Sequence, residues 1–365
     1  MAFEIEVYFY IMTNRTQQEI MQNWGADYFA MPLVSVHCIT YNHEPYIAQA
    51  LDGFLMQKTN FPFEVIVHDD ASTDRTAEII REYEARFPKI IKPIYETENQ
   101  YSKHDGSLGR IMDAACKGKY IAFCEGDDYW IDGNKLQMQV DFLEGNPEYG
   151  MCYTRARQFI QKERIFSKTL FGKPVADFND LLQNGNRIPT LTVMLRKSLH
   201  ERYREEIHPE NKGWLMDDYP TWLYVAHESK VKFVDSVTSV YRVLEESASH
   251  SKDFAKMVAF EVSSFSILVY FAEKYNVGDF PIKKEKERYV YKCLELRNRK
   301  VCRKIDTSGL ALKFKVIKMA SFSPVSFRLL GGLRKVWLFL KKTLVERMTM
   351  QKVIVKKMEG EGMKV

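Results

Sequence analysis

The chain has 365 residues and a mass of 42.8 kDa, which suits one large domain with an appendage or two domains. Its 45% hydrophobic and 28% charged residues exclude a disordered chain and a fibrous repeat. No apolar stretch reaches the roughly 20 residues of a membrane span, so we expect no integral span. The net charge of +5 hides an asymmetry, because residues 283–357 hold 22 Lys and Arg against 5 Asp and Glu. The other residues number 31 basic and 43 acidic, so the sequence describes an acidic body with a basic C-terminal region.

The cysteines and the N-terminus indicate a cytoplasmic protein. Six cysteines stand singly, without a CxxC pair: Cys38, Cys116, Cys124, Cys152, Cys293 and Cys302. Several lie inside apolar runs, which favours buried free thiols over a disulfide framework or a zinc site. Residues 1–12 are apolar but contain two glutamates and no basic residue, so they do not resemble a signal peptide.

From Pro32 onward, strand and helix signals alternate along the chain. We predict strands at 33–40, 63–68, 90–95 and 119–124, separated by helices that include 47–56, 77–87 and 108–116 and followed by a helix at 136–143. This rhythm predicts an α/β fold with a Rossmann-like, mostly parallel sheet flanked by helices. In such sheets, ligands bind beyond the carboxyl ends of the strands.

The rhythm loosens after about residue 150. Further strands are predicted at 149–160, 190–196 and 230–242, and helices at 218–227, 255–275 and 283–304. We therefore predict an N-terminal extension (1–31), a catalytic domain (32–252) and a helical, basic C-terminal region (253–365).

Acidic residues gather where two predicted strands end. Asp69 and Asp70 close one strand, and Glu125, Asp127 and Asp128 close another. A lone Asp-Asp pair is more often a solvated turn, but two clusters at equivalent strand ends favour a shared site. Like charges at one edge repel, so we expect Mg²⁺ or Mn²⁺ to offset them and to bridge the acids to a substrate diphosphate.

The chain resembles family 2 glycosyltransferases of the GT-A fold in three segments: PLVSVHCITYNHEPYIAQAL, VIVHDDASTDRTAEII and YIAFCEGDDYW. The resemblance covers roughly residues 32–250 and is strongest to bacterial enzymes that assemble surface polysaccharides. It implies an inverting, metal-dependent transfer of a sugar from a nucleotide-diphosphate sugar, expected to be a UDP-sugar. The implied acceptor is a hydroxyl of a glycan or of a lipid-linked glycan.

The resemblance also assigns roles to individual residues. It implies that nucleotide-sugar contacts come from Thr40, Tyr41, Asn42, Glu44, Asp69, Asp70, Glu125, Gly126, Asp127 and Arg242. Asp69 and Asp70 match the pair that contacts base and ribose, and Arg242 is a candidate phosphate contact. The metal would be held by Asp127 and Asp128, with His250 as a further candidate. Glu125 replaces the usual first Asp of the DxD-type motif, which leaves open whether it contacts the ribose.

An inverting displacement needs one general base to take the proton of the acceptor hydroxyl. Asp217 and Asp218, in WLMDDYPTWL, stand where the resembling family places its catalytic acids. We expect Asp218 to be the base, with Asp217 as the alternative. Nearby, Trp130 and Trp214 suit either sugar stacking or core packing, whereas Trp222 is expected in the core.

The basic C-terminal region has an amphipathic pattern. Apolar residues recur at helical spacing at Leu333, Val336, Trp337, Leu340 and Leu344, with basic residues between them. This pattern favours an anionic membrane surface, which predicts a cytoplasmic protein held on the inner face of the cytoplasmic membrane. Packing on the catalytic domain and an oligomer contact are the alternatives. No nucleic-acid-binding module accompanies the charge, so no nucleic-acid partner is expected.

Two other functions compete with glycosyl transfer. A sugar nucleotidyltransferase also needs acids and a metal, but it would bring a Gly-rich basic loop after the first strand, and ITYNHEPY is not one. A non-enzymatic membrane adaptor would use only the basic region and would leave the acidic clusters without a role.

Overall fold

The computed structural model describes residues 15–25, 31–245, 254–278, 282–295, 297, 299–305 and 307–334. By backbone contacts, the chain divides into two compact units, residues 1–271 and 272–365. The domain boundaries proposed from the sequence, 32–252 and 253–365, stay a prediction. No helix of the described ranges combines the length and the apolar character that crossing a membrane requires.

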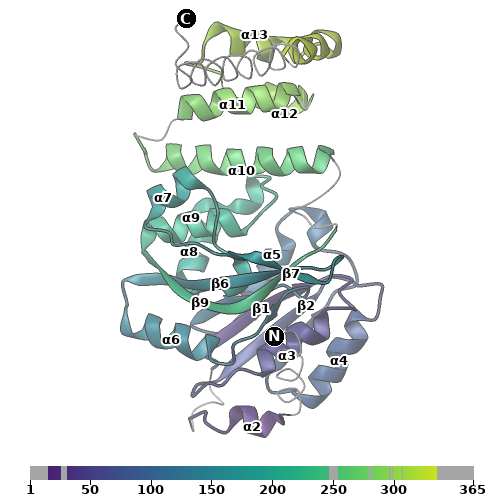
Figure 1. Cartoon of the computed structure of the whole chain (residues 1–365), viewed down its shortest axis with the longest axis vertical. Coiled ribbons are helices and arrows are strands. Elements are labelled where there is room, and N and C mark those ends of the chain that lie inside the picture. Colours follow the sequence, from purple (N-terminus) through teal and green to yellow (C-terminus); the bar gives the residue numbers. More distant parts are fainter. Residues whose placement is uncertain are drawn as a thin grey trace, which may run out of the picture. The chain divides into compact units, whose positions relative to one another are not determined.

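A single mixed sheet organises the first unit (Figure 1). Its strands are β1 (Val34–Thr40), β2 (Phe63–Asp69), β3 (Ile91–Tyr95), β4 (Tyr120–Phe123), β5 (Tyr129–Trp130), β6 (Tyr149–Ile160), β7 (Ile165–Phe171), β8 (Met194–Arg196) and β9 (Lys230–Val243). Their order is β3-β2-β1-β4-β8-β6-β9-β5, and β7 pairs with β6. Six of the nine strands run in one direction, because only β5, β7 and β8 are antiparallel to their neighbours. The predicted α/β class with a mostly parallel sheet is confirmed.

Helices connect these strands and continue into the second unit. They are α2 (Gln17–Met21), α3 (Ile47–Leu55), α4 (Thr76–Arg86), α5 (Ser107–Ala115), α6 (Lys135–Gly145), α7 (Phe178–Asn184), α8 (Lys197–Ile207), α9 (Asp218–Glu228), α10 (Phe254–Lys274), α11 (Ile282–Glu295), α12 (Arg299–Lys304) and α13 (Leu312–Ala320). Short 3₁₀ turns lie at η2 (Tyr101–Lys103), η3 (Thr190–Thr192) and η4 (Pro209–Asn211).

The sheet is buried on both faces. Helices α3, α4 and α6 cover one face, and α5, α8 and α9 cover the other (Figure 1). Alternate residues of β4 divide between them: Tyr120 and Ala122 join the core with α3 and α6, whereas the Phe123 ring lies 5.6 Å from the Trp222 ring of α9. The near-continuous apolar strands are typical of parallel sheets covered on both sides. All six cysteines are free and buried, as the sequence predicted.

Several elements were not predicted from the sequence, among them α2, β5, β7, α7 and α8. The strand expected at 190–196 begins as the 3₁₀ turn η3 before the three residues of β8. Strand β7 is a mostly exposed edge strand, so it lacks the buried run that marks a strand in a sequence. Helix α8 did carry a signal, because Leu199, Tyr203 and Ile207 are buried and recur every four residues.

The close approach of α3 to β5 allows a stability test. A Cβ on Gly53 would lie 2.9 Å from the backbone N and O of Trp130, closer than real Cβ atoms come to other atoms. We therefore expect Gly53→Ala to lower the free energy of unfolding by about 1–3 kcal/mol in urea denaturation. Gly145→Ala is the control, since a Cβ there meets nothing within 4 Å and alanine favours a helix. Equal stabilities of the two variants would contradict this packing.

Candidate active site

Two loops at the carboxyl ends of β1 and β2 are joined by hydrogen bonds. The Asn42 N–H donates to Ser72 Oγ at 2.9 Å, and Asn42 Oδ1 accepts the Thr73 N–H at 2.8 Å. The Glu44 N–H donates to Asp74 Oδ2 at 3.0 Å. Asn42 is in the left-handed region with φ 54°, which asparagine tolerates better than most residues. Asn42 and Glu44, predicted as nucleotide contacts, thus fix one loop against the other.

The neighbouring acids Asp69 and Asp70 have different surroundings. Both carboxylate oxygens of Asp70 are engaged, since Oδ1 accepts the Gln100 N–H at 2.6 Å and Oδ2 accepts the Tyr101 N–H at 3.0 Å. Asp69 is 3% exposed, and among the described residues its Oδ1 has no hydrogen-bond partner. Burial raises the pKa of Asp69 above its ordinary value. Asp70 therefore holds the loop after β3, while Asp69 keeps a buried acceptor for another molecule.

Gly126, in the turn after β4, lies against the loop that follows β1. β1 and β4 are parallel, and the chain after β4 continues beside β1, where the Gly126 N–H donates to the Ile39 carbonyl at 2.9 Å. A Cβ on Gly126 would lie 2.7 Å from Thr40 Oγ1 and 3.1 Å from His43 Nδ1. Both of these atoms are buried and lack a hydrogen-bond partner within the described ranges. Tyr41, by contrast, is 44% exposed at the surface of the loop.

His43 is a site residue that the sequence analysis did not single out. It lies between Asn42 and Glu44, so its position in the first motif was the available signal. Burial lowers the pKa of His43, against the opposing effect of the nearby Asp127 carboxylate.

The acidic turn after β4 concentrates negative charge. Burial raises the pKa of Glu125 to about 7, and the carboxylates of Asp127 and Asp218 add to the shift. Asp128 is 3% exposed, and its pKa is raised by burial and then by Asp127 and Glu125. The Arg242 N–H donates to Asp128 Oδ1 at 2.7 Å and offsets part of this repulsion. The turn and the start of α9 therefore belong to one electrostatic cluster.

Arg242 stabilises the acidic turn from β9. Its Nε donates to the Asp127 carbonyl at 2.6 Å, its Nη1 donates to Gln161 Oε1 at 3.0 Å and its Nη2 donates to Gln49. The guanidinium also lies over the Tyr129 ring, 4.8 Å from its centroid. All three nitrogens thus serve protein acceptors, and the arrangement gives Arg242 a positioning role. Its predicted contact with phosphate stays a prediction.

The start of α9 holds the two predicted catalytic acids. Asp218 Oδ2 accepts from Asn186 Nδ2 at 3.0 Å and from Thr190 Oγ1 at 3.2 Å. Burial raises the pKa of Asp218, although the N-terminal end of a helix favours a carboxylate. The Asp217 side chain is 76% exposed and lies 4.0 Å from Arg204 Nη1. Asp218 is therefore the better shielded and better oriented of the two.

The acidic residues fit a metal ion that is held partly by the protein and partly by the substrate. Within the described ranges, no three His, Cys, Asp or Glu side chains converge as a ligand set, and His250 lies outside those ranges. Mg²⁺ and Mn²⁺ commonly use one or two carboxylates plus substrate phosphates, so this arrangement suffices. Of the residues described, none donates a hydrogen bond to the Asp127 carboxylate, whereas Asp128 is buried against Arg242. Asp127 is thus the residue best placed to hold the metal.

The tryptophans near the acids pack inside the protein. Trp130 is fully buried, and its Nε1 donates to the Leu191 carbonyl at 2.8 Å. Trp222 is 1% exposed, which confirms its predicted place in the core. Trp214 is partly exposed, and its ring lies 6.1 Å from that of Phe271 in a stacked arrangement.

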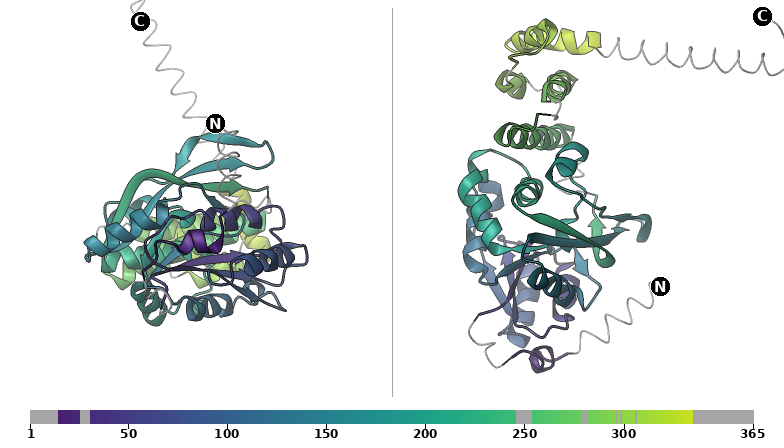
Figure 2. Two further views of the ribbon diagram at one scale, coloured as in Figure 1. Left: turned by 90° about the horizontal axis from the view of Figure 1, so that it is seen from below. Right: turned by 90° about the vertical axis from the view of Figure 1, so that its left-hand side faces the viewer.

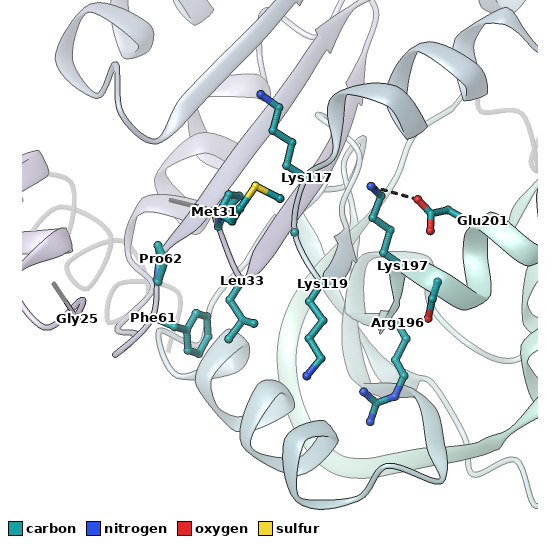
Figure 3. A pocket seen from close by; sticks show the side chains of 13 residues that line it. Gly25, Met31, Leu33, Phe61, Pro62, Lys117, Lys119, Arg196, Lys197 and Glu201 are labelled. Carbon is teal, nitrogen blue, oxygen red and sulfur yellow. Dashed lines mark ion pairs between the residues drawn. The ribbon is translucent and has the colours of Figure 1, made fainter. Parts of the chain in front are cut away.

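A separate cavity of about 680 Å³ lies at the opposite edge of the sheet (Figure 3). Its lining includes Leu33 and Pro62, which directly precede β1 and β2. Two of the basic residues that line it have these protein partners: Lys197 pairs with Glu201 at 3.2 Å, and Arg196 donates to the Tyr149 carbonyl at 2.9 Å. Because the strands' carboxyl ends carry the acids, this cavity is not part of the acidic site.

Comparisons with known proteins identify the class of protein. Residues 35–203 match the family model of glycosyl transferase family 2. An uncharacterized protein of Mycobacterium tuberculosis is 48% identical over 124 residues, 34% of this chain and 35% of that protein. The match thus spans little more than a third of that relative's own length.

Two further proteins are similar over longer stretches. The UDP-Glc:alpha-D-GlcNAc-diphosphoundecaprenol beta-1,3-glucosyltransferase WfgD of Escherichia coli is 29% identical over 227 residues, 60% of this chain and 81% of that protein. The crystal structure of S. aureus TarS 1–349 in complex with UDP-GlcNAc has a TM-score of 0.48 and 16% identity, over 83% of this chain and 91% of that one.

The family match begins in β1 and runs into α8, so it includes Thr40, the Asp69–Asp70 pair and the turn at 125–128. Residues 35–203 therefore form a region similar to family 2 glycosyltransferases. The resemblance to this family and the α/β fold class inferred from the sequence are confirmed, and the activity of the whole chain is proposed below. Asp217 and Asp218 lie beyond the matched residues, and their roles stay a prediction.

The contrast between Asp69 and Asp70 predicts opposite effects on stability without ligand. Asp70→Asn places an amide where two backbone N–H groups need acceptors, and we expect it to lower the free energy of unfolding by about 1–3 kcal/mol. Asp69→Asn removes a buried charge whose pKa is raised, so its stability at neutral pH should equal or exceed that of the wild type. Urea denaturation measures both variants, and a larger loss in Asp69→Asn would refute the distinction.

Proposed function

We propose that this chain is an inverting, metal-dependent glycosyltransferase. It moves a sugar from a nucleotide-diphosphate sugar, in the form of a UDP-sugar, to a hydroxyl of a glycan or lipid-linked acceptor in bacterial surface polysaccharide synthesis. The observation that carries the proposal is the gathering of Asp69, the 125–128 turn and Asp218 at one edge of the sheet. The similarity to WfgD, which is named for a UDP-sugar donor and a diphosphoundecaprenol-linked acceptor, supports this choice of substrates.

The nucleotide would occupy the loops after β1 and β2. Asp69 presents a buried, unpartnered carboxylate oxygen, which suits the ring N–H of a pyrimidine base such as uracil. Thr40, paired with Asp69 in the sheet register, adds a hydroxyl without a described partner. Asn42 and Glu44 then act through the loop geometry that they fix, and Tyr41 is exposed enough to stack on the base.

The diphosphate and sugar would lie over the acidic turn. Asp127 would hold Mn²⁺ or Mg²⁺ together with the phosphates, with Asp128 and Arg242 fixing the turn beneath it. When bound, the metal supplies positive charge that stabilises the departing nucleoside diphosphate. Burial and the carboxylates of Asp127 and Asp218 raise the pKa of Glu125, so a bound metal ion would offset part of this repulsion.

Asp218 would act as the general base. Asn186 and Thr190 orient its Oδ2, and the carboxylate would accept the proton of the acceptor hydroxyl. The acceptor oxygen then bonds to the anomeric carbon as the bond from that carbon to the diphosphate oxygen breaks. A raised pKa brings Asp218 nearer to the pH at which the proton must be taken, which makes it a more effective base.

The product separates this proposal from its rivals. Incubation with a UDP-sugar, Mn²⁺ and a lipid-linked acceptor should release UDP, whereas a nucleotidyltransferase would release pyrophosphate from UTP and a sugar phosphate. A membrane adaptor would bind no nucleotide at all. A thermal-shift panel of nucleotide sugars with Mn²⁺ identifies the donor, because a bound ligand stabilises the fold by mass action.

The same proposal places the protein in the cytoplasm, attached to the inner face of the cytoplasmic membrane. A lipid-linked acceptor lies at that surface, and the basic C-terminal region has the charge that anionic lipids attract. Leu333, one of the five residues of the predicted amphipathic pattern, is 67% exposed, and the other four lie outside the described residues.

Substitution of the catalytic acids gives the sharpest mechanistic result. Asp218→Asn should reduce kcat for transfer by about 10²–10⁴-fold, because the amide cannot accept the proton. Binding of the UDP-sugar should persist. Asp217→Asn, the matched control one residue away, should retain most of the activity, since that side chain is 76% exposed. Loss of transfer only in Asp217→Asn would move the base to that residue.

The metal role of Asp127 predicts a change in ligand binding. In calorimetric titrations with Mn²⁺, Asp127→Ala should bind the UDP-sugar at least about tenfold more weakly than the wild type. Addition of EDTA should weaken the wild type to a similar degree and leave the variant almost unchanged. Asp141→Ala, at an exposed aspartate of α6, should behave as the wild type does. A wild type insensitive to EDTA would argue against metal-dependent binding.

A further inference from the structure

The outer side of α13 and of the helical residues 324–334 is apolar and exposed to solvent. Seven large hydrophobic side chains on these helices and on the turn between them are 45–76% exposed: Leu312, Val316, Met319, Phe322, Val325, Leu329 and Leu333. We call this set the C-terminal apolar face. Its members follow one another at intervals of three or four residues, which keeps them on one side of each helix.

The C-terminal apolar face is not the side that holds the second unit together. The opposite side of the same helices carries Phe314, Ile317 and Phe327, all buried. The Phe314 ring lies 4.8 Å from the Tyr291 ring of α11, and α13 packs against α11 and α12 (Figure 2). These helices therefore have two apolar sides, and only one of them packs against other described residues of the unit. A cluster of this size left in water indicates a surface that binds another body.

The charge around the face favours an anionic partner. Residues 307–334 contain no Asp or Glu but five basic residues, Lys313, Lys315, Lys318, Arg328 and Arg334. Lys315 and Arg328 are exposed and lie beside the apolar side chains on their helices. An apolar stripe edged by basic residues matches the interface of a bilayer that contains anionic lipid.

We propose that the C-terminal apolar face inserts into the headgroup region of an anionic bilayer, with Lys315 and Arg328 contacting lipid phosphates. This inference rests on the proposed function only in that the same bilayer would present a lipid-linked acceptor. The proposed contact surface lies upstream of the amphipathic pattern predicted from the sequence. Leu333 is the one residue that the two share.

Vesicle binding by the full chain tests the inference. The probes are vesicles of phosphatidylcholine alone and vesicles with about 30% phosphatidylglycerol, separated by sedimentation. The variant Val316→Gln/Met319→Gln/Val325→Gln/Leu329→Gln should lose at least about tenfold in binding to the anionic vesicles. The control Ile165→Gln/Leu170→Gln, at exposed apolar residues of β7, should bind as the wild type does. Lys315→Gln/Arg328→Gln should bind more weakly at low salt and show a smaller loss of binding when salt is added.

Several outcomes would overturn the inference. It fails if the wild type does not bind anionic vesicles, if it binds neutral ones equally well, or if the fourfold variant binds unchanged. It also fails if the face joins two copies, shown by a wild-type dimer in lipid-free buffer that the fourfold variant dissociates. Titration of every variant with a UDP-sugar and Mn²⁺ checks folding and separates the two proposals. If nucleotide binding is intact but vesicle binding is absent, only the proposed membrane surface is rejected. If vesicle binding is intact but nucleotide binding is absent, only the proposed glycosyl transfer is rejected.

Discussion

The site depends on holding several carboxylates together at the carboxyl edge of one sheet. Parallel pairing of β1 with β2 and β4 brings Thr40, Asp69 and the 125–128 turn to the same edge, and α9 adds Asp218. Like charges in a partly buried site repel strongly, because neither water nor salt screens them well. Hydrogen bonds within the protein offset part of this repulsion. Backbone N–H groups donate to the carboxylates of Asp70 and Asp128, and the guanidinium of Arg242 donates to a carbonyl of the turn. The negative charge that remains at this edge is available to bind a metal ion together with its nucleotide.

This compensation divides the acids into two kinds. Asp70 and Asp128 are satisfied by the protein and fix the positions of loops, whereas Asp69 and Asp127 keep oxygens that no described residue engages. Asp218 stands between these kinds, because Asn186 and Thr190 orient one of its oxygens. Burial and hydrogen bonding alone thus give chemically similar carboxyl groups different surroundings, which suit the positioning, binding and catalytic roles proposed for them. The second unit contributes a different physical property, a two-sided apolar helix pair in a stretch free of acids.

Much of this could be predicted from the sequence, for reasons that are local. Apolar runs ending at Thr40, His68 and Cys124 marked the strands and their carboxyl ends, and strand–helix alternation then required the acids to meet. The roles of Arg242 and Asp70 could not be predicted, because their partners are 115 and 30 residues away, respectively, and depend on the folded register. His43 and the C-terminal apolar face show the same limit: which atoms stay unpartnered, and which side of a helix stays exposed, is decided by packing between distant segments. Edge strand β7 was not predicted, because most of its residues are exposed and its sequence therefore lacks the apolar run of a buried strand.

Hydrogen–deuterium exchange with UDP and Mn²⁺ tests most directly whether these segments form one nucleotide site. The account predicts slower exchange of backbone amides in the loops at 41–44 and 69–74, in the 125–128 turn and at the start of α9, all in the same titration. Exchange around the cavity at the opposite edge, near Leu33, Pro62 and Gly118, should not change. Protection confined to that cavity, with the acidic edge unaffected, would contradict the account.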